Sequence, residues 1–480
     1  MELERGSTDT KIWKDVKRKR VRIPDLVCQQ CGLRIESRAK TKPDLSMSHA
    51  PGEAERAWDF GMVDADYVAF PVCEPADEEY WNNGKLSDHS SYWHERNWVR
   101  WMPRSHVNYF TVSSFRSTPP ARSSTKGVTE GSETSIAWPA TFSTRTGTVE
   151  AVTERGLTVR RTSDGHRYTW KTRGGLNARV RVNDHVNENQ VILSTVEPVA
   201  PAELQCSGLL PDGHIARLLG SRERTQRFTA IKLARLRNDA SFERIVAQLH
   251  VDSEEDVYIR LEAASYLAAT CGRSARELCG PFIRDLDEQT QLEAIIAIGE
   301  VATDEAGELL CEILDTQTHP YFLRSAAAWS LSRCGGQPAQ VRLIKAFADV
   351  DASIREEALE SLVTVGGPAV PLLLNGLWDC DSEVAAGCAE ALRQHGCLPN
   401  DRLQELVAQL NGADSPDWTV WLLGQLPRDH VSTAIAGLQD SAPHLHYAIS
   451  LLWSFAESWI ARRWELKPRS GKEAPSGGPV

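Results

Sequence analysis

The sequence predicts a multidomain protein: an N-terminal α/β domain, a small all-β module and a C-terminal all-α solenoid. A helical nine-residue pattern recurs at steps of 30 to 33 residues through the second half of the chain. Short alternating strands precede it, and a stretch rich in Ser, Thr, Pro and Gly indicates a linker between the two β-containing parts. The predicted boundaries are 1–113, a linker over 114–135, the module over 136–200, the solenoid over 208–460 and a disordered tail over 461–480.

Composition bounds the class of protein. A chain of 480 residues exceeds one ordinary core, so about two to four domains are expected. Its 41% hydrophobic and 25% charged residues are normal for a soluble protein, and the net charge of −11 argues against non-specific coating of nucleic acid. With no apolar run of membrane-spanning length and no signal-peptide pattern, we expect a cytoplasmic protein without a membrane partner. The 11 cysteines are then expected to be mostly free thiols.

The N-terminus is locally basic. Met1 to Lys42 holds 12 Lys/Arg against 6 Asp/Glu, and six of these bases lie between Lys14 and Arg22. Such an edge on an acidic protein is typical of docking onto one anionic partner, with a solvated helix end as the alternative. The residues expected to bind nucleic acid are Lys17, Arg18, Lys19, Arg20 and Arg22.

The solenoid is predicted by internal repetition. Nine-residue segments with small middle residues and an apolar ninth residue begin at 228, 259, 290, 323, 354 and 384. Glycine-containing turns follow several of them, and a second apolar stretch then begins a partner helix. A two-helix unit of this length cannot bury its own apolar face, so about eight such units, two of them weaker copies, must stack. The copies are Phe228–Leu236, Ile259–Leu267, Thr290–Ile298, Leu323–Leu331, Ile354–Leu362 and Val384–Leu392, with weaker ones at Trp418–Leu426 and Leu445–Trp453.

This array resembles the HEAT-repeat family, particularly the short form related to phycobilisome-lyase repeats. The resemblance implies a binding scaffold for a protein partner or a substrate, and it keeps an enzyme-assembly factor of the lyase type as one alternative. His319 and His395 are expected to be loop or cap residues of the array rather than ligands.

A β-hairpin is predicted within the first 45 residues. Glu36, Arg38 and Lys40 lie two residues apart on its second strand, so they project from one face. Asp25 lies near the start of the partner strand. The hairpin is therefore expected to bring one aspartate, one glutamate and two cations together. Its predicted parts are a strand over 23–28, a tight turn over 29–32 and a strand over 33–40.

This arrangement resembles the PD-(D/E)xK nuclease superfamily, which includes many restriction-type endonucleases. A Pro-Asp pair ending at Asp25 corresponds to the first half of its motif, and Glu36, Ser37 and Arg38 to the second. The resemblance implies that Asp25, Glu36 and the Ser37 carbonyl hold Mg²⁺ or Mn²⁺, which polarises the scissile phosphate and activates water. It also implies a helix-borne carboxylate, for which Glu4 is the candidate.

One position departs from the family pattern. The usual lysine is Arg38 here, with Lys40 one pleat further along, and arginine is a poor proton acceptor. Three interpretations therefore stay open. The head is a Mg-dependent DNA endonuclease of a restriction or defence type, an inactive nucleic-acid-binding head on a HEAT-repeat adaptor, or a chance match to the motif.

Two further features of the N-terminal part have two interpretations each. Cys28 and Cys31 resemble a zinc knuckle, which needs two more ligands, with Cys73 and His49 as candidates; an unliganded turn is the alternative. The segment Trp93–Trp101 interleaves three tryptophans with arginines, which suits base stacking or packing of a helix onto the sheet.

The apolar run 67–73 predicts a buried strand that ends near its proline.

The module over 136–200 resembles the barrel-sandwich hybrid fold of biotinyl and lipoyl domains, chiefly in Val182–Ile192. The family's modifiable lysine is absent, because Gln190-Val191-Ile192 runs on to Ser194. A covalently carried cofactor is therefore not expected, and a β spacer or docking module is the preferred interpretation.

Overall fold

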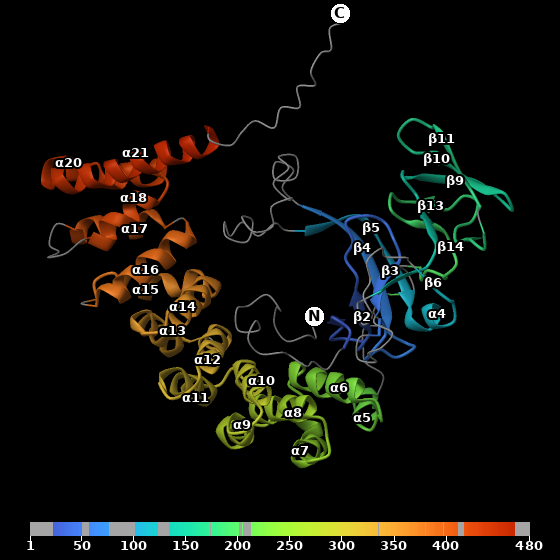
Figure 1. Ribbon diagram of the computed structural model, residues 1–480, viewed down its shortest axis with the longest axis horizontal. Coiled ribbons are helices and arrows are strands. Elements are labelled where there is room, and N and C mark those ends of the chain that lie inside the picture. The colour runs from blue at the N-terminus through green and yellow to red at the C-terminus, as the bar shows by residue number, and fades with distance from the viewer. Residues whose placement is uncertain are drawn as a thin grey trace, which may run out of the picture. The chain divides into compact units, whose positions relative to one another are not determined.

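The computed structural model describes residues 23–49, 57–75, 101–122, 134–172, 174–200, 204, 213–334, 336–379, 381–396, 398–410 and 417–465. These residues form two compact units, which divide near residue 259. The first unit contains the β structure and the first helices, and the second contains the remaining helices (Figure 1).

A four-stranded mixed sheet forms the N-terminal head. The first two strands form an antiparallel hairpin in which Leu26 lies opposite Ile35, which confirms the predicted hairpin. The turn closes with a hydrogen bond from the Gly32 amide to the Cys28 carbonyl (2.8 Å), and Gly32 has a φ of 71°, which glycine adopts easily. In sheet order the strands are β1 (Leu26–Val27), β2 (Arg34–Ser37), β4 (Tyr67–Pro75) and β5 (Trp101–Thr111).

The strand predicted to end near Pro71 continues past it. Strand β4 extends to Pro75 and pairs antiparallel with β5, with a register shift between Pro71 and Cys73. A proline lacks the amide hydrogen that a regular ladder uses, and an irregularity in the pairing accommodates this loss. The sequence predicted the strand correctly and placed its end wrongly.

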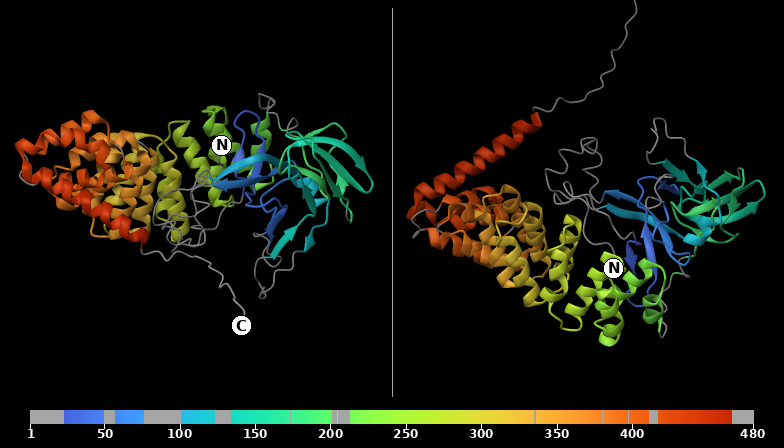
Figure 2. Two further views of the ribbon diagram at one scale, coloured as in Figure 1. Left: turned by 90° about the horizontal axis from the view of Figure 1, so that it is seen from above. Right: turned by 60° about the horizontal axis from the view of Figure 1, so that its bottom comes forward.

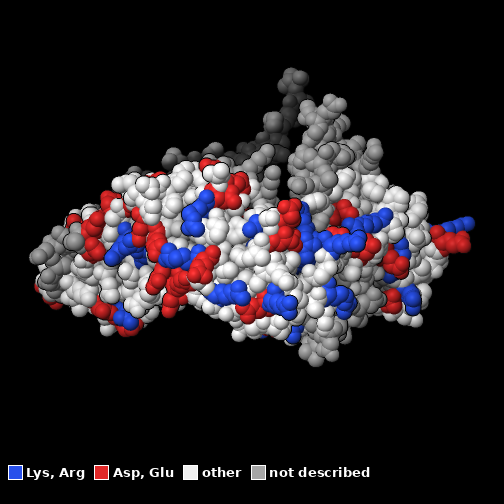
Figure 3. All heavy atoms as spheres, turned by 90° about the horizontal axis from the view of Figure 1, so that it is seen from below, with Lys and Arg blue, Asp and Glu red and all other residues white. Residues whose placement is uncertain are grey.

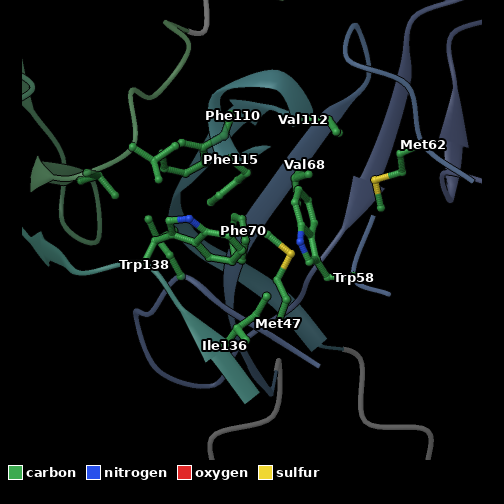
Figure 4. Packing of buried hydrophobic residues seen from close by; sticks show 13 residues of the cluster. Met47, Trp58, Met62, Val68, Phe70, Phe110, Val112, Phe115, Ile136 and Trp138 are labelled. Atoms are coloured by element: carbon green, nitrogen blue, oxygen red, sulfur yellow. The ribbon is translucent and has the colours of Figure 1, made fainter. Parts of the chain in front are cut away.

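An aromatic core lies on one side of this sheet (Figure 4). The rings of Phe115 and Trp138 lie 4.7 Å apart, and Trp58 and Trp138 lie 5.5 Å apart, both in edge-on geometry. Phe70 and Phe110 complete the cluster from β4 and β5. Edge-to-face rings of this kind add to the stabilisation from burial.

Part of the segment predicted as a linker belongs to this core. Helix α4 (Val112–Arg116) supplies Phe115, which is 1% exposed, and the Trp138 indole donates to the Thr118 carbonyl at 2.7 Å. The serine- and proline-rich composition concealed the few apolar residues that pack here. Residues 123–133 lie outside the described part of the chain. The flanking strand β7 (Thr134–Ala137) pairs with β3 (Ser46–His49) on one side and with β6 (Ala121–Arg122) on the other, in a three-stranded sheet.

Two small sheets form the β module. Both contribute to one apolar core, which contains Val149, Leu157, Val186 and Ile192. A turn precedes β13, in which the Asp184 carboxylate accepts a hydrogen bond from the Arg181 amide (2.7 Å). One sheet has the order β11 (Arg167–Lys171), β10 (Gly156–Arg161), β9 (Gly147–Thr153), β13 (His185–Val186), and the other β12 (Asn177–Ala178), β14 (Val191–Ser194), β8 (Ala140–Phe142).

Paired helices form the second half of the chain, as predicted (Figures 1 and 2). The six main nine-residue segments each lie inside a helix, and the weaker copy Trp418–Leu426 extends one residue past α18. The partner helices alternate with these. The first unit contains α5 (His214–Leu219), α6 (Arg224–Leu236) and α7 (Glu243–Val251), and α8 (Val257–Ala269) begins at its border. The second unit contains α9 (Ala275–Ile283), α10 (Glu288–Gly299), α11 (Asp304–Asp315), α12 (Tyr321–Cys334), α13 (Gln337–Lys345), α14 (Ala352–Val365), α15 (Val370–Gly376), α16 (Ser382–His395), α17 (Asn400–Leu410), α18 (Asp417–Gln425), α19 (Arg428–Ile435), α20 (Leu438–Ser441) and α21 (Pro443–Glu465).

Small residues allow the helices to pack closely. A side chain at Gly387 of α16 would place its Cβ 2.3 Å from the ring of Phe347. Several of these helices begin with an aspartate cap. Asp287, Asp351 and Asp381 each accept a hydrogen bond from a first-turn amide, which satisfies a donor that has no helical partner.

The last helix is longer than predicted. Helix α21 extends through Glu465, so residues 461–465 are helical and not part of a disordered tail. Among the described residues, no single helix is long and apolar enough to cross a membrane. One bent pair, 352–365 with 367–376, meets the length and composition criteria jointly.

Candidate site on the N-terminal hairpin

The hairpin places Asp25 beside Glu36. Since Leu26 pairs with Ile35 across antiparallel strands, the preceding residue, Asp25, stands opposite Glu36. Directly opposite residues share one face, with Cβ atoms about 5 Å apart. The Asp25 carboxylate also accepts a hydrogen bond from the Ser37 amide at 2.7 Å, which fixes it against the second strand. Asp25 is thereby held against the residue that follows Glu36 in the second strand.

Glu36 lies at the border of the aromatic core. Strand β2 runs parallel to β4 with Glu36 beside Val68, and Val68 and Phe70 belong to that core. The Glu36 side chain is 12% exposed, and one of its carboxylate oxygens lies 2.8 Å from Nη2 of Arg38. An ion pair with little access to water interacts more strongly than one at the surface, because the effective dielectric constant is lower.

Arg38 is the cation at this carboxylate. Its Nη2 also donates to the Trp58 carbonyl at 3.3 Å, while its Nε is buried without a hydrogen-bond partner among the described residues. A buried guanidinium donor without a partner is uncommon in a folded protein. The Nε of Arg38 is therefore a donor at this site that suits a hydrogen bond to an anionic oxygen.

Lys40 is directed elsewhere. Its ammonium donates to the Ser46 carbonyl at 2.6 Å and to the Ser46 hydroxyl at 3.0 Å, and it lies 3.4 Å from the Asp44 carboxylate. The backbone of Lys40 still follows the sheet, because its amide donates to the Pro71 carbonyl. The two predicted cations therefore have different roles. Arg38 pairs with Glu36, and Lys40 contacts Asp44 and Ser46 and so stabilises the turn over 44–46.

The donor chemistry fits part of a Mg²⁺ or Mn²⁺ site. Asp25 and Glu36 offer the hard oxygen atoms that these ions prefer, and the Ser37 carbonyl directly follows Glu36 in sequence. In the described ranges no group of three or more His, Cys, Asp or Glu side chains is placed to hold a metal ion. The predicted fourth donor, Glu4, lies outside those ranges.

The zinc prediction gains no support. Cys28 and Cys31 flank the hairpin turn, but the described residues do not gather them with Cys73 and His49 into a metal-binding group. Burial raises the pKa of the Cys73 thiol, which disfavours the thiolate that zinc requires.

All five predicted nucleic-acid-binding residues fall outside the described part of the chain. They are Lys17, Arg18, Lys19, Arg20 and Arg22, and residues 93–100 of the tryptophan-rich segment lie outside it as well.

The sequence interpretation missed Arg34. This residue makes a two-pronged ion pair with Asp66, with Nη2–Oδ2 and Nε–Oδ1 distances of 2.6 and 2.8 Å. Its Nη1 also donates to the Thr225 carbonyl and the Thr229 hydroxyl, both at 3.2 Å, which ties the hairpin to α6. The signal was present, because Arg34 lies in the same alternating row as Glu36 and Arg38.

Comparison with known proteins identifies the helical region. Residues 243–332 and 277–363 match a model of HEAT repeats. These helices are HEAT repeats. Solved structures similar to the array include the CpcE–CpcF complex of phycocyanin lyase from Nostoc sp. PCC7120, with 19% identity over 44% of this chain and 94% of that chain, at a TM-score of 0.21. Human deoxyhypusine hydroxylase is 21% identical over 48% of this chain and 85% of that chain, at a TM-score of 0.19.

A designed armadillo-repeat protein in complex with a peptide is 15% identical over 50% of this chain and 97% of its own, at a TM-score of 0.21. No curated protein matches the chain. The term HEAT array is used below for helices α6 to α21.

Proposed function

We propose that the protein is a metal-dependent phosphodiesterase that cleaves DNA, with the HEAT array as a scaffold for substrate or partner protein. The proposal is supported by the hydrogen bond that holds the Asp25 carboxylate at the Ser37 amide, the residue after Glu36, and by the Arg38 guanidinium on the Glu36 carboxylate.

Each residue has a distinct role in this proposal. Asp25, Glu36 and the Ser37 carbonyl hold Mg²⁺ or Mn²⁺, which when bound neutralises phosphate charge and lowers the pKa of a coordinated water. Arg38 offsets the charge that develops on the phosphoryl oxygens through its guanidinium. It stays protonated throughout, so it does not accept the proton of the attacking water.

The HEAT array supplies an extended surface for a protein partner. Each unit of such an array contacts only its neighbours, so the stacked units extend in one direction and together present a long surface. The face drawn in Figure 3 mixes Lys and Arg with Asp and Glu. Interspersed charges favour a partner of mixed charge over a polyanion.

A second candidate function is a non-catalytic adaptor whose head binds nucleic acid. The ion pair between Glu36 and Arg38 favours it, because a carboxylate neutralised by a neighbouring guanidinium attracts a divalent cation less strongly.

The test is cleavage of plasmid and linear DNA by the full-length protein with Mg²⁺ or Mn²⁺. Asp25→Ala and Glu36→Ala should each abolish cleavage, while Arg38→Ala should lower it about 100- to 1,000-fold, as loss of an electrostatic stabiliser does. Arg38→Lys should retain cleavage because it keeps a cation at the position. Asp64→Asn is the matched control, because this head carboxylate is 71% exposed and pairs with Arg116 away from the hairpin.

Three outcomes separate the hypotheses. Cleavage that survives in both carboxylate variants would contradict the proposed site. If the wild-type protein binds DNA without cleaving it, and both carboxylate variants bind DNA equally well, the adaptor is selected. Absence of DNA affinity at low salt, where phosphate contacts are strongest, would favour an assembly factor.

A further inference from the structure

The β module is a basic region on an acidic protein. Between Arg145 and Arg181 the chain holds nine Lys/Arg against three Asp/Glu, whereas the whole chain has a net charge of −11. Three further acids, Asp184, Glu188 and Glu197, follow before residue 200. Strands β9 to β11 and the turns that join them hold five of these nine bases and all three acids, so this segment has a small positive excess: Arg155, Arg160, Arg161, Arg167 and Lys171 against Glu150, Glu154 and Asp164.

The strand register gathers cations and hydroxyl groups on one face of this sheet. Arg160 of β10 pairs with Thr148 of β9 on one side and with Arg167 of β11 on the other. Alternation along β11 places Thr169 and Lys171 on the same side as Arg167. This surface, here called the outer face, consists of Thr148, Glu150, Thr158, Arg160, Arg167, Thr169 and Lys171, with His185 of β13 beside Thr148.

The apolar residues lie on the opposite face. Leu157 and Val159 belong to the module core, and their cross-strand neighbours are Trp170 and Tyr168. Trp170 packs against that core. The aromatic rings of β11 thus face away from Arg160 and Arg167, and the outer face carries no Phe, Tyr or Trp among its described residues.

Two arginines stand directly opposite each other on the outer face. Arg160 and Arg167 are 57% and 71% exposed, and like charges in directly opposed positions are destabilising. One carboxylate serves both: Glu150 accepts from Nε of Arg167 at 2.6 Å and lies 3.2 Å from Nε of Arg160. Its pKa is lowered, chiefly by the hydrogen bond from Arg167. Two guanidiniums and the exposed Lys171 therefore leave a surplus of positive charge.

We propose that the outer face binds the phosphate backbone of double-stranded DNA. Exposed guanidiniums and hydroxyls are the donors that contact phosphate oxygens. Single-strand binders stack unpaired bases on aromatic rings, and this face offers none among its described residues, which favours a duplex. The inference goes beyond the hairpin site, because it rests on residues of the β module alone and requires no cleavage.

The experiment measures binding of a labelled short duplex by the full-length protein in EDTA across a range of salt concentrations. Arg160→Gln with Arg167→Gln should weaken binding, and the slope of log K against log salt should fall by about one for each phosphate that is no longer neutralised. Glu150→Gln should act in the opposite direction and tighten binding several-fold, because it removes the carboxylate that neutralises the pair.

Arg276→Gln is the matched control, because this arginine is 47% exposed and paired with Glu312 in the HEAT array. Asp64→Asn, in the head and away from the hairpin, should bind the duplex as the wild type does. Duplex binding in EDTA and cleavage with Mg²⁺ are separate readouts, so failure of one proposal is distinguishable from failure of the other. An unchanged affinity and salt slope in the double variant, or looser binding by Glu150→Gln, would overturn the proposal. So would tighter binding of a single strand than of the duplex through the same arginines.

Discussion

Arg34 connects three parts of the first unit through a single side chain. Its guanidinium pairs with Asp66, which also accepts the Val63 amide at 2.8 Å, and donates to Thr225 and Thr229 of α6. The side chains of Arg34 and Asp66 are 6% and 4% exposed. Buried charges of this kind are stable only as a complete set, so removal of one leaves the other without compensation.

Arg34→Ala should therefore lower the free energy of unfolding of the first unit by about 3–5 kcal/mol, as measured by urea denaturation. Arg116→Ala removes ion pairs with two carboxylates, Asp59 and Asp64, at a site where the arginine is 37% exposed, and should cost about 1 kcal/mol or less. Arg34→Met combined with Asp66→Leu should recover part of the loss. Equal effects of the two arginine substitutions would refute the importance of burial.

Cys388 gives a pH-dependent contribution in the second unit. Burial, with a smaller effect from the Asp379 charge, raises the pKa of its thiol from 9.0 to about 12. The folded state therefore holds this proton more tightly than the unfolded state does. The stabilisation is complete below pH 9 and is lost as the pH rises from there towards 12.

Cys388→Ala should remove this dependence. Above pH 9 the stability advantage of the wild type over the variant should fall by up to about 1.4 kcal/mol per pH unit, because only the unfolded wild type releases the thiol proton. Urea denaturation of both proteins over this range measures the difference, and other titrating groups cancel. A constant difference across the range would show that the folded thiol titrates normally.

Among the structural elements, the helices were predicted most accurately. The period of the nine-residue segments depends on side-chain size and apolarity, which can be read directly from the sequence, and the six main segments each lie inside a helix. The strands were located less well, because their ends depend on neighbours. The passage of β4 through Pro71 requires the register shift against β5, which the sequence of β4 alone does not reveal.

Glycines within the helices provide a direct test of the packing. Gly387→Ala should destabilise the second unit by about 1–3 kcal/mol, because its Cβ would meet the buried ring of Phe347. Gly307→Ala, in α11, meets nothing within 4 Å and should stabilise by about 0.4–1 kcal/mol through reduced freedom of the unfolded chain. Thermal unfolding should show opposite shifts, and a lower stability at both positions would contradict this account.

For the whole molecule, the sequence predicted the order of parts better than their connections. The succession of head, β module and helical repeats follows from local patterns along the chain. The hairpin was also within reach, because its two strands are joined by a short turn whose register follows from its length. The contact of Arg34 with α6 was out of reach, because it joins residues 191 and 195 positions apart.

That separation has a consequence for synthesis. Arg34 and Asp66 leave the ribosome long before Thr225 and Thr229, so a growing polypeptide must carry the buried pair without its helical acceptors. The hairpin cannot reach its final set of hydrogen bonds until α6 has emerged. A chain that ends just before α6 would therefore have a head in which the Arg34 guanidinium lacks two of its hydrogen-bond acceptors. The shortest stable fragment that contains the head must include that helix.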